Sequence, residues 1–182
     1  MRRTGQAPYR CRPVNSALGL MTTCSEDRRA ENDKRVAADV EKYGCHVISV
    51  FDPDEKLPTF SYSVGIQATS GAPEAIVIGV RPNLGHSMIN EYNDQVRKGV
   101  GFERAKQYPG FLEGFKIYVE PAKSALLSEY TLGCNRFYKG TDYSVVQLIY
   151  PTTAGAWPWQ RAASEWFRSN QPMLGRKHPY RK

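Results

Sequence analysis

Apolar and polar positions alternate along most of the chain in short periods, and these periods predict a mixture of helices and strands without any internal repeat. Residues 25–43 carry apolar side chains at helical spacing, and Ser25 is of a type that caps helix N-termini. Gly44 follows where a helix commonly ends. Residues 45–51 are rich in β-branched side chains and apolar on both faces, which predicts a buried strand.

The segment "FSYSVGIQATSGAPEAIVIGV", residues 60–80, places two apolar runs around a turn rich in Ser, Gly, Ala and Pro. It predicts a hairpin with an irregular turn from Ala68 to Pro73. The second run is apolar on both faces and predicts a central strand. The first run predicts a strand with a small face, which lets a packed neighbour or a ligand approach the backbone. Its bulky residues are Phe60, Tyr62, Val64 and Ile66, and its small ones are Ser61, Ser63 and Gly65.

The remaining pattern predicts a helix over 81–99, a strand, a short helix, a strand, and a last helix over 157–170. The 81–99 helix has an apolar stripe of Leu84, Met88, Ile89, Tyr92 and Val96, beside a polar stripe of His86, Asn90, Asn93 and Arg97. The last helix would start near Pro158 and bury Trp159, Ala163, Trp166 and Phe167. This order predicts a single α+β domain, with helices packed on a mixed or antiparallel sheet of about five strands.

The formal net charge of +7 is concentrated at the two ends of the chain. Residues 1–35 carry +4 and residues 161–182 carry +5, whereas the middle carries −2. We therefore expect a loosely attached basic segment over 1–23, a domain over 24–171 and a basic tail over 172–182. Deleting both ends should change the melting temperature by less than about 4 °C. Basic ends favour weak, non-specific contact with nucleic acid through their charge.

No apolar run reaches the roughly 18 residues that a membrane span needs, and the apolar patch at 17–21 is too short for a signal peptide. The sequence thus predicts a cytoplasmic protein without a membrane contact. Of its four cysteines, Cys45 and Cys134 are expected to be buried thiols. With three scattered histidines and no nucleotide-binding motif, the sequence predicts neither a metal site nor a cofactor.

Six polar residues at strand ends and helix starts are the candidates for a site: Tyr62, Ser63, Glu74, His86, Asn90 and Gln147. Glu74 or His86 would act as acid or base, and the other four would contact a ligand. Structural alternatives stand beside each role. His86 and Asn90 could lie on a solvated helix face, Gln147 could belong to a buried amide network, and Glu74 could simply open its strand.

Four motifs follow one another in order: "YGCHVISVFDPDEKLPTFSYSVGI", "APEAIVIGV", "LGHSMINEYNDQVRKG" and "VVQLIYP…GAWPW". Together they resemble the bacterial and phage family called Domain of Unknown Function 4262, over roughly residues 40–160. The chain departs from the family pattern at Cys45, Ala72, Tyr150 and Thr152, where the family tends to have Trp, His, Trp and Asp. The family has no assigned activity, so the resemblance implies no reaction.

Two hypotheses of function remain at this point. The first is a domain that binds a small polar ligand in a cleft beside the 60–80 hairpin, with or without acid–base chemistry. The second is a module that docks a protein or dimerises as a homodimer, with basic ends that touch nucleic acid. Convergence of the polar candidates in one pocket would favour the first, and their dispersal with an exposed aromatic patch would favour the second.

Overall fold

The computed structural model describes residues 19–52, 54, 57–123 and 127–175. The described part of the chain divides into two units between Arg35 and Val36, and the second unit contains the sheet. Among the described residues, no helix is both long and apolar enough to cross a membrane. The elements in chain order are α1 (Gly19–Tyr43), β1 (His46–Val50), β2 (Phe60–Val64), α2 (Ile66–Ser70), β3 (Glu74–Ile78), α3 (Pro82–Arg97), β4 (Gln107–Leu112), β5 (Phe115–Pro121), α4 (Leu127–Tyr130), α5 (Leu132–Phe137), β6 (Val145–Ile149) and α6 (Glu165–Asn170).

The described strands form one sheet in the order β1-β2-β3-β6-β5-β4. All neighbours are antiparallel except β3 and β6, which run parallel, so the sheet is mixed and the α+β prediction is confirmed. The described sheet has six strands, whereas about five were predicted. The sequence pattern does not predict β4, because this strand has no apolar alternation. Pro109 and Gly110 lie inside β4, and residues of these two types are expected only at sheet edges or bulges, as here.

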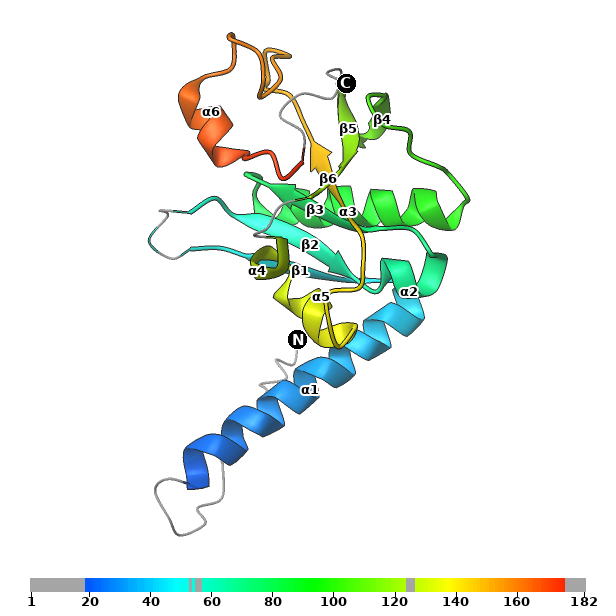
Figure 1. Cartoon of the computed structure of the whole chain (residues 1–182), viewed down its shortest axis with the longest axis vertical. Coiled ribbons are helices and arrows are strands. Elements are labelled where there is room, and N and C mark those ends of the chain that lie inside the picture. Colours follow the sequence, from blue (N-terminus) through cyan, green and yellow to red (C-terminus); the bar gives the residue numbers. More distant parts are fainter. Residues whose placement is uncertain (1–18, 53, 55–56, 124–126, 176–182) are drawn as a thin grey trace, which may run out of the picture. The chain divides into compact units, whose positions relative to one another are not determined.

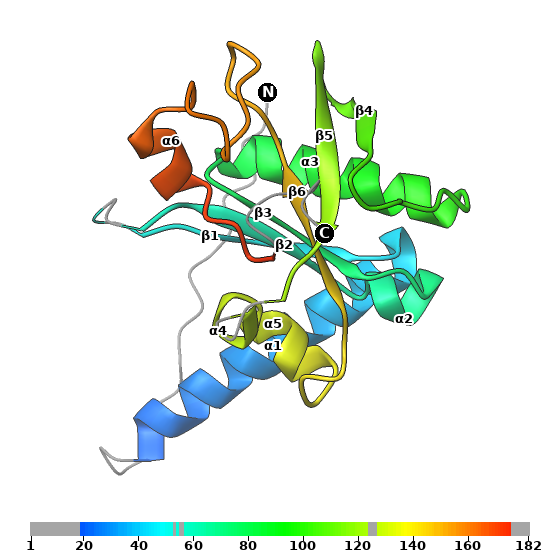
Figure 2. The same ribbon diagram turned by 45° about the horizontal axis from the view of Figure 1, so that its top comes forward.

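Two apolar layers cover the two faces of this sheet. Figures 1 and 2 show α3 on one face and α5 on the other. The α3 layer packs Met88, Ile89 and Tyr92 against side chains of β3, β5 and β6. On the opposite face, Val36 and Val40 of α1 pack with Cys134 of α5 against β2 and β3. Cys45 and Cys134 are buried free thiols, as the sequence predicts.

The 60–80 segment is a strand pair with a helix in its connection. Tyr62 pairs with Ile76, and all five residues of β3 are buried at the centre of the sheet, as predicted. Ile66, however, is not part of the first strand, because the chain turns at Gly65 (φ 103°) and enters α2. A Cβ at residue 65 would lie 2.4 Å from Val40, so glycine is required for this close approach as well as for the turn.

Several boundaries differ from those that the pattern predicts. α1 begins at Gly19, so Ser25 lies inside the helix and does not cap it. β1 is an edge strand and is only half buried, whereas two buried faces were expected. Leu84 is 41% exposed, because its neighbour Gly85 is the residue of the first turn of α3 that packs against the sheet.

The C-terminal part also differs from its prediction. α6 is a short helix that Ser164 caps through a bond from the Phe167 N–H (3.2 Å), so Pro158 lies well before its start. Phe167 and Ala163 are buried as expected, but Trp166 is 72% exposed. Trp159 precedes the helix and stacks on Trp157.

The folded domain continues past residue 171, where the tail was expected to begin. Leu174 is buried in the layer that contains α5. The Gln147 amide holds this segment to the sheet, since its Nε2 donates to Pro172 O (2.8 Å) and its Oε1 accepts from Leu174 N–H (2.8 Å). Residues 172–175 therefore belong to the domain, and the remaining residues of the expected tail lie outside the described part.

Candidate functional site

The six predicted site residues do not converge on one cavity. Tyr62, Ser63, Glu74 and Gln147 are buried in or beside the sheet. His86 and Asn90 are exposed on α3. The structure thus brings together two pairs, Ser63 with Glu74 and His86 with Asn90, in different parts of the domain.

Glu74 is the centre of a buried polar cluster. It accepts hydrogen bonds from the hydroxyl of Ser63 (2.5 Å) and from the hydroxyl of Tyr138. It also accepts from the backbone N–H groups of Gly65 (2.9 Å) and Gln67 (3.1 Å) at the start of α2. Four donors from three elements therefore surround this carboxylate, which is 0% exposed. Such an arrangement offsets the cost of burying the group and leaves no opening for a ligand.

The other buried candidates also have partners inside the chain. Ser63 Oγ accepts from the Ala75 N–H (2.8 Å) in addition to its bond with Glu74. The Tyr62 hydroxyl accepts from the Gly133 N–H (2.9 Å), and burial raises the pKa of this tyrosine to about 12. Gln147 uses both ends of its amide, as described above. These contacts support a structural role inside the fold for each of the three residues.

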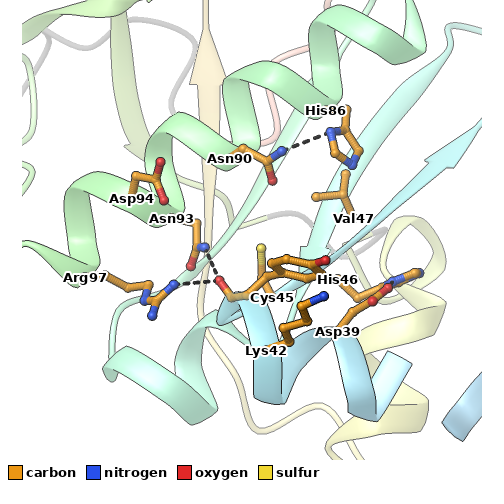
Figure 3. A pocket seen from close by; sticks show the side chains of 11 residues that line it. Asp39, Lys42, Cys45, His46, Val47, His86, Asn90, Asn93, Asp94 and Arg97 are labelled. Atoms are coloured by element: carbon orange, nitrogen blue, oxygen red, sulfur yellow. Dashed lines mark hydrogen bonds and ion pairs between the residues drawn. The ribbon is translucent and has the colours of Figure 1, made fainter. Parts of the chain in front are cut away.

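His86 and Asn90 line a cavity of about 420 Å³ that we call the polar cleft. It lies where the last turns of α1, the start of β1 and α3 meet (Figure 3). Its lining combines amides, imidazoles and charges of both signs. The lining residues are Asp39, Lys42, Tyr43, Cys45, His46, Val47, His86, Asn90, Asn93, Asp94 and Arg97.

The α3 wall of the polar cleft is the polar stripe that the sequence predicts, since positions 86, 90, 93 and 97 all line it. Asn90 Nδ2 lies 3.0 Å from His86 Nδ1, as Figure 3 shows. With the Asn90 amide as donor, neutral His86 carries its proton on Nε2. This imidazole can then present Nε2–H to a bound molecule.

Asn93 and Arg97 fix the α3 wall to the end of α1. Asn93 Nδ2 and Arg97 Nη1 each donate to the carbonyl of Tyr43 at 2.9 Å. This carbonyl belongs to the last turn of α1, where the helix itself provides no donor. Asn93 Oδ1 is buried and has no hydrogen-bond partner within the described part of the chain. A buried acceptor without a partner is uncommon and costs stability, so it calls for an explanation.

The opposite wall holds a second imidazole. His46 Nδ1 lies 2.7 Å from Asp39 Oδ2, and Figure 3 shows this ring turned toward α1, away from the α3 side chains. The Asp39 carboxylate accepts a hydrogen bond from Nδ1–H, so a neutral His46 has its unprotonated nitrogen at Nε2. Sequence reasoning did not single out Asp39, Lys42 or His46, because their proximity to α3 depends on a tertiary contact. The only sequence indication was the position of His46 just after the helix end at Gly44.

The thiol of Cys45 also lines the polar cleft. Burial, and then the negative charge of Glu74, raise the pKa of this thiol to about 12. Cys45 is therefore a neutral thiol near pH 7 and a poor nucleophile. Across the described ranges, no three His, Cys, Asp or Glu side chains are grouped so that they could hold a metal ion. Hydrogen bonding and ion pairing are the interactions that the lining residues can offer.

Comparison with known proteins agrees with the resemblance noted in the sequence. Searches of curated proteins and of solved structures found no match. A family model matches residues 39–164, which covers most of the domain and every strand of the described sheet. The chain therefore belongs to the family described as Domain of unknown function (DUF4262).

Proposed function

We propose that this protein binds a small polar ligand in the polar cleft. The observation that carries the proposal is the lining of this cavity, which combines the hydrogen-bonded pair of His86 and Asn90 with charged side chains of both signs. The cavity volume of about 420 Å³ is in the range of small-molecule sites.

The charges around the polar cleft indicate a ligand with both donor and acceptor groups. Asp39 and Asp94 provide negative charge, and Lys42 and Arg97 provide positive charge. Lys42 is already placed over the Tyr43 ring, 4.8 Å from its centroid. A ligand with a carboxylate or phosphate near the cations and an amine or hydroxyl near Asp94 would match this distribution.

His86 is the candidate for proton exchange with such a ligand. Its ring is exposed in the polar cleft, and an imidazole nitrogen can donate a proton to a bound molecule or accept one from it. Glu74, the other predicted acid or base, is enclosed by its own donors and does not line the cleft. Tyr62, Ser63 and Gln147 support the sheet in this proposal rather than contacting the ligand.

The dispersal of the six predicted site residues and the exposure of Trp166 (72%) favour the interaction-module hypothesis. The nucleic-acid part of that hypothesis depends on the basic ends of the chain. Residues 1–18 and 176–182 lie outside the described part, and residues 172–175 pack on the sheet. No contact of the described residues favours nucleic-acid binding over ligand binding. We favour the polar cleft because it is a defined cavity with hydrogen-bonding and charged lining residues.

The test is a titration of the full chain with amino acids, small carboxylic acids and nucleoside monophosphates, followed by backbone amide shifts in NMR spectra. We expect saturable shifts around residues 43–47 and 86–97 for at least one class. Asn90→Ala should weaken that binding about ten-fold, because a hydrogen bond to the ligand is lost. Asn83→Ala, an exposed asparagine of the same helix outside the cleft lining, is the matched control and should change nothing. Absence of saturable shifts, or equal effects of the two variants, would contradict the proposal.

A further inference from the structure

A second cavity of about 500 Å³ shares no lining residue with the polar cleft. Four parts of the domain form its walls: the first turn of α3, the β4–β5 turn, the end of β6 and helix α6. We call it the apolar groove, because aromatic and aliphatic side chains dominate its lining. The residues that matter below are Leu84, Glu113, Phe115, Tyr150, Trp166 and Phe167.

The floor of the apolar groove is rigidly held. Tyr150 and Phe167 are each 8% exposed and meet edge to face, with ring centroids 5.7 Å apart. The Tyr150 hydroxyl donates to the carbonyl of Ile78 (3.1 Å), so the polar end of this ring is used inside the fold. What faces the groove from the floor is therefore a fixed aromatic surface rather than a polar one.

The rim of the groove exposes large apolar side chains to water. Trp166 is 72% exposed and Leu84 is 41% exposed, although the sequence pattern places both on buried stripes. Exposed apolar side chains gathered around a concavity commonly mark a binding site, because covering them releases ordered water. Four separate parts of the domain border the groove. Its volume is within the range of about 300–1,000 Å³ that is usual for small-molecule sites.

The charge of the lining indicates which kind of small molecule fits. Glu113 is the one charged side chain among the residues that line the groove, and no Lys, Arg or His is among them. A carboxylate and an exposed indole that line the same groove both attract a cation, since the face of a tryptophan ring is negative. An anionic ligand would meet the carboxylate without any compensating charge.

We propose that the apolar groove binds a small organic cation, an aromatic or aliphatic group that carries one ammonium charge. The apolar group lies against Tyr150 and Trp166, and the ammonium group lies toward Glu113. This site acts independently of the polar cleft. The proposal thus stands or falls separately from the function proposed above.

The test uses three probes of similar shape on the full chain: 2-phenylethylammonium, 2-phenylethanol and phenylacetate. Their affinities are measured by calorimetric or NMR titration at low ionic strength. We expect the cation to bind more tightly than the neutral alcohol and the anion to bind most weakly. His86→Ala, which alters the polar cleft, should leave unchanged the binding that Trp166→Ala weakens.

Two substitutions and one control localise the binding. Trp166→Ala removes an exposed wall and should weaken the cation and the alcohol about ten-fold. Glu113→Gln should weaken the cation about three-fold, a size typical of an exposed charge, and leave the alcohol unchanged. Glu165→Gln removes an exposed carboxylate of α6 that does not line the groove, and it should have no effect.

Three results would overturn the proposal. The first is binding of phenylacetate that Trp166→Ala weakens and that is as tight as, or tighter than, the binding of 2-phenylethylammonium. The second is an equal effect of Glu113→Gln and Glu165→Gln on the cation, which would show only a long-range influence of net charge. The third is association between copies of the chain that Trp166→Ala abolishes, because the groove would then be a protein interface.

Discussion

The buried cluster around Glu74 and the polar cleft around His86 use similar residue types for different purposes. In the cluster, the carboxylate meets four donors, and Ser63 Oγ is bonded on two sides. In the polar cleft, the side chains line an open cavity, and Asn93 Oδ1 has no partner within the described residues. The chemical type of a polar side chain is therefore a weaker guide to its role than its hydrogen bonds are. A side chain whose hydrogen bonds are satisfied within the fold has a structural role.

This contrast separates stability from binding. A buried polar group with all its partners holds elements together, and removing it leaves several donors or acceptors unpaired. An exposed polar group at a cavity contributes little to stability, so its loss should be felt only by a ligand. The substitutions below test this separation, beginning with the largest expected effect.

Glu74→Ala should lower the free energy of unfolding by about 3 kcal/mol or more. It removes the acceptor for the N–H groups of Gly65 and Gln67 and for two hydroxyls, and each unpaired buried group costs about 1–3 kcal/mol. Urea denaturation followed by circular dichroism measures the loss. Glu103→Ala is the control, since the exposed side chain of Glu103 pairs with Lys106 at 2.7 Å, a contact worth less than about 1 kcal/mol. A loss below 1 kcal/mol for Glu74→Ala would mean that the cluster is not structural.

Ser63→Leu should cost about 1–3 kcal/mol, because it forces a larger side chain into a site that is 0% exposed. Ser63→Ala separates volume from hydrogen bonding. It adds no bulk but leaves the Ala75 N–H and one Glu74 oxygen without their partner, so we expect a cost of about 1 kcal/mol. Thermal or urea melts of the two variants give both values. An unchanged stability of Ser63→Leu would show that the small face of β2 is not closely packed.

The small face of β2 also shows how much the sequence could predict. The alternation of Ser61 and Ser63 with bulky residues correctly predicts a close neighbour. Gly85 of α3 is that neighbour for Ser61, since a Cβ at residue 85 would lie 2.6 Å from Ser61 Oγ. The alternation of small and bulky residues within β2 does not indicate whether the neighbour is a helix or a ligand, because that depends on how α3 crosses the sheet.

The same limit explains the partly predicted site. The helical spacing of His86, Asn90 and Arg97 correctly placed them on one stripe. The residues opposite them, Asp39 and His46, come from α1 and β1, and no local pattern links those elements to α3. The sequence predicts Glu74 as a candidate acid or base because local periodicity cannot reveal its four donors. These donors lie between residues 63 and 138 of the chain.

The smallest effect is expected for Tyr62→Phe, which keeps the ring and removes one hydroxyl. The Gly133 N–H loses its acceptor in this variant, so the free energy of unfolding should fall by about 1 kcal/mol. Tyr43→Phe removes the same hydroxyl from a ring that is 52% exposed, and its stability should be unchanged within about 0.5 kcal/mol. Urea melts of the two variants make this comparison, and NMR titration adds the second readout. Ligand binding in the polar cleft should survive Tyr62→Phe because Tyr62 does not line the cleft. Loss of binding with unchanged stability would show that Tyr62 contributes to ligand binding. The separation of a structural cluster from a binding cleft would then be wrong.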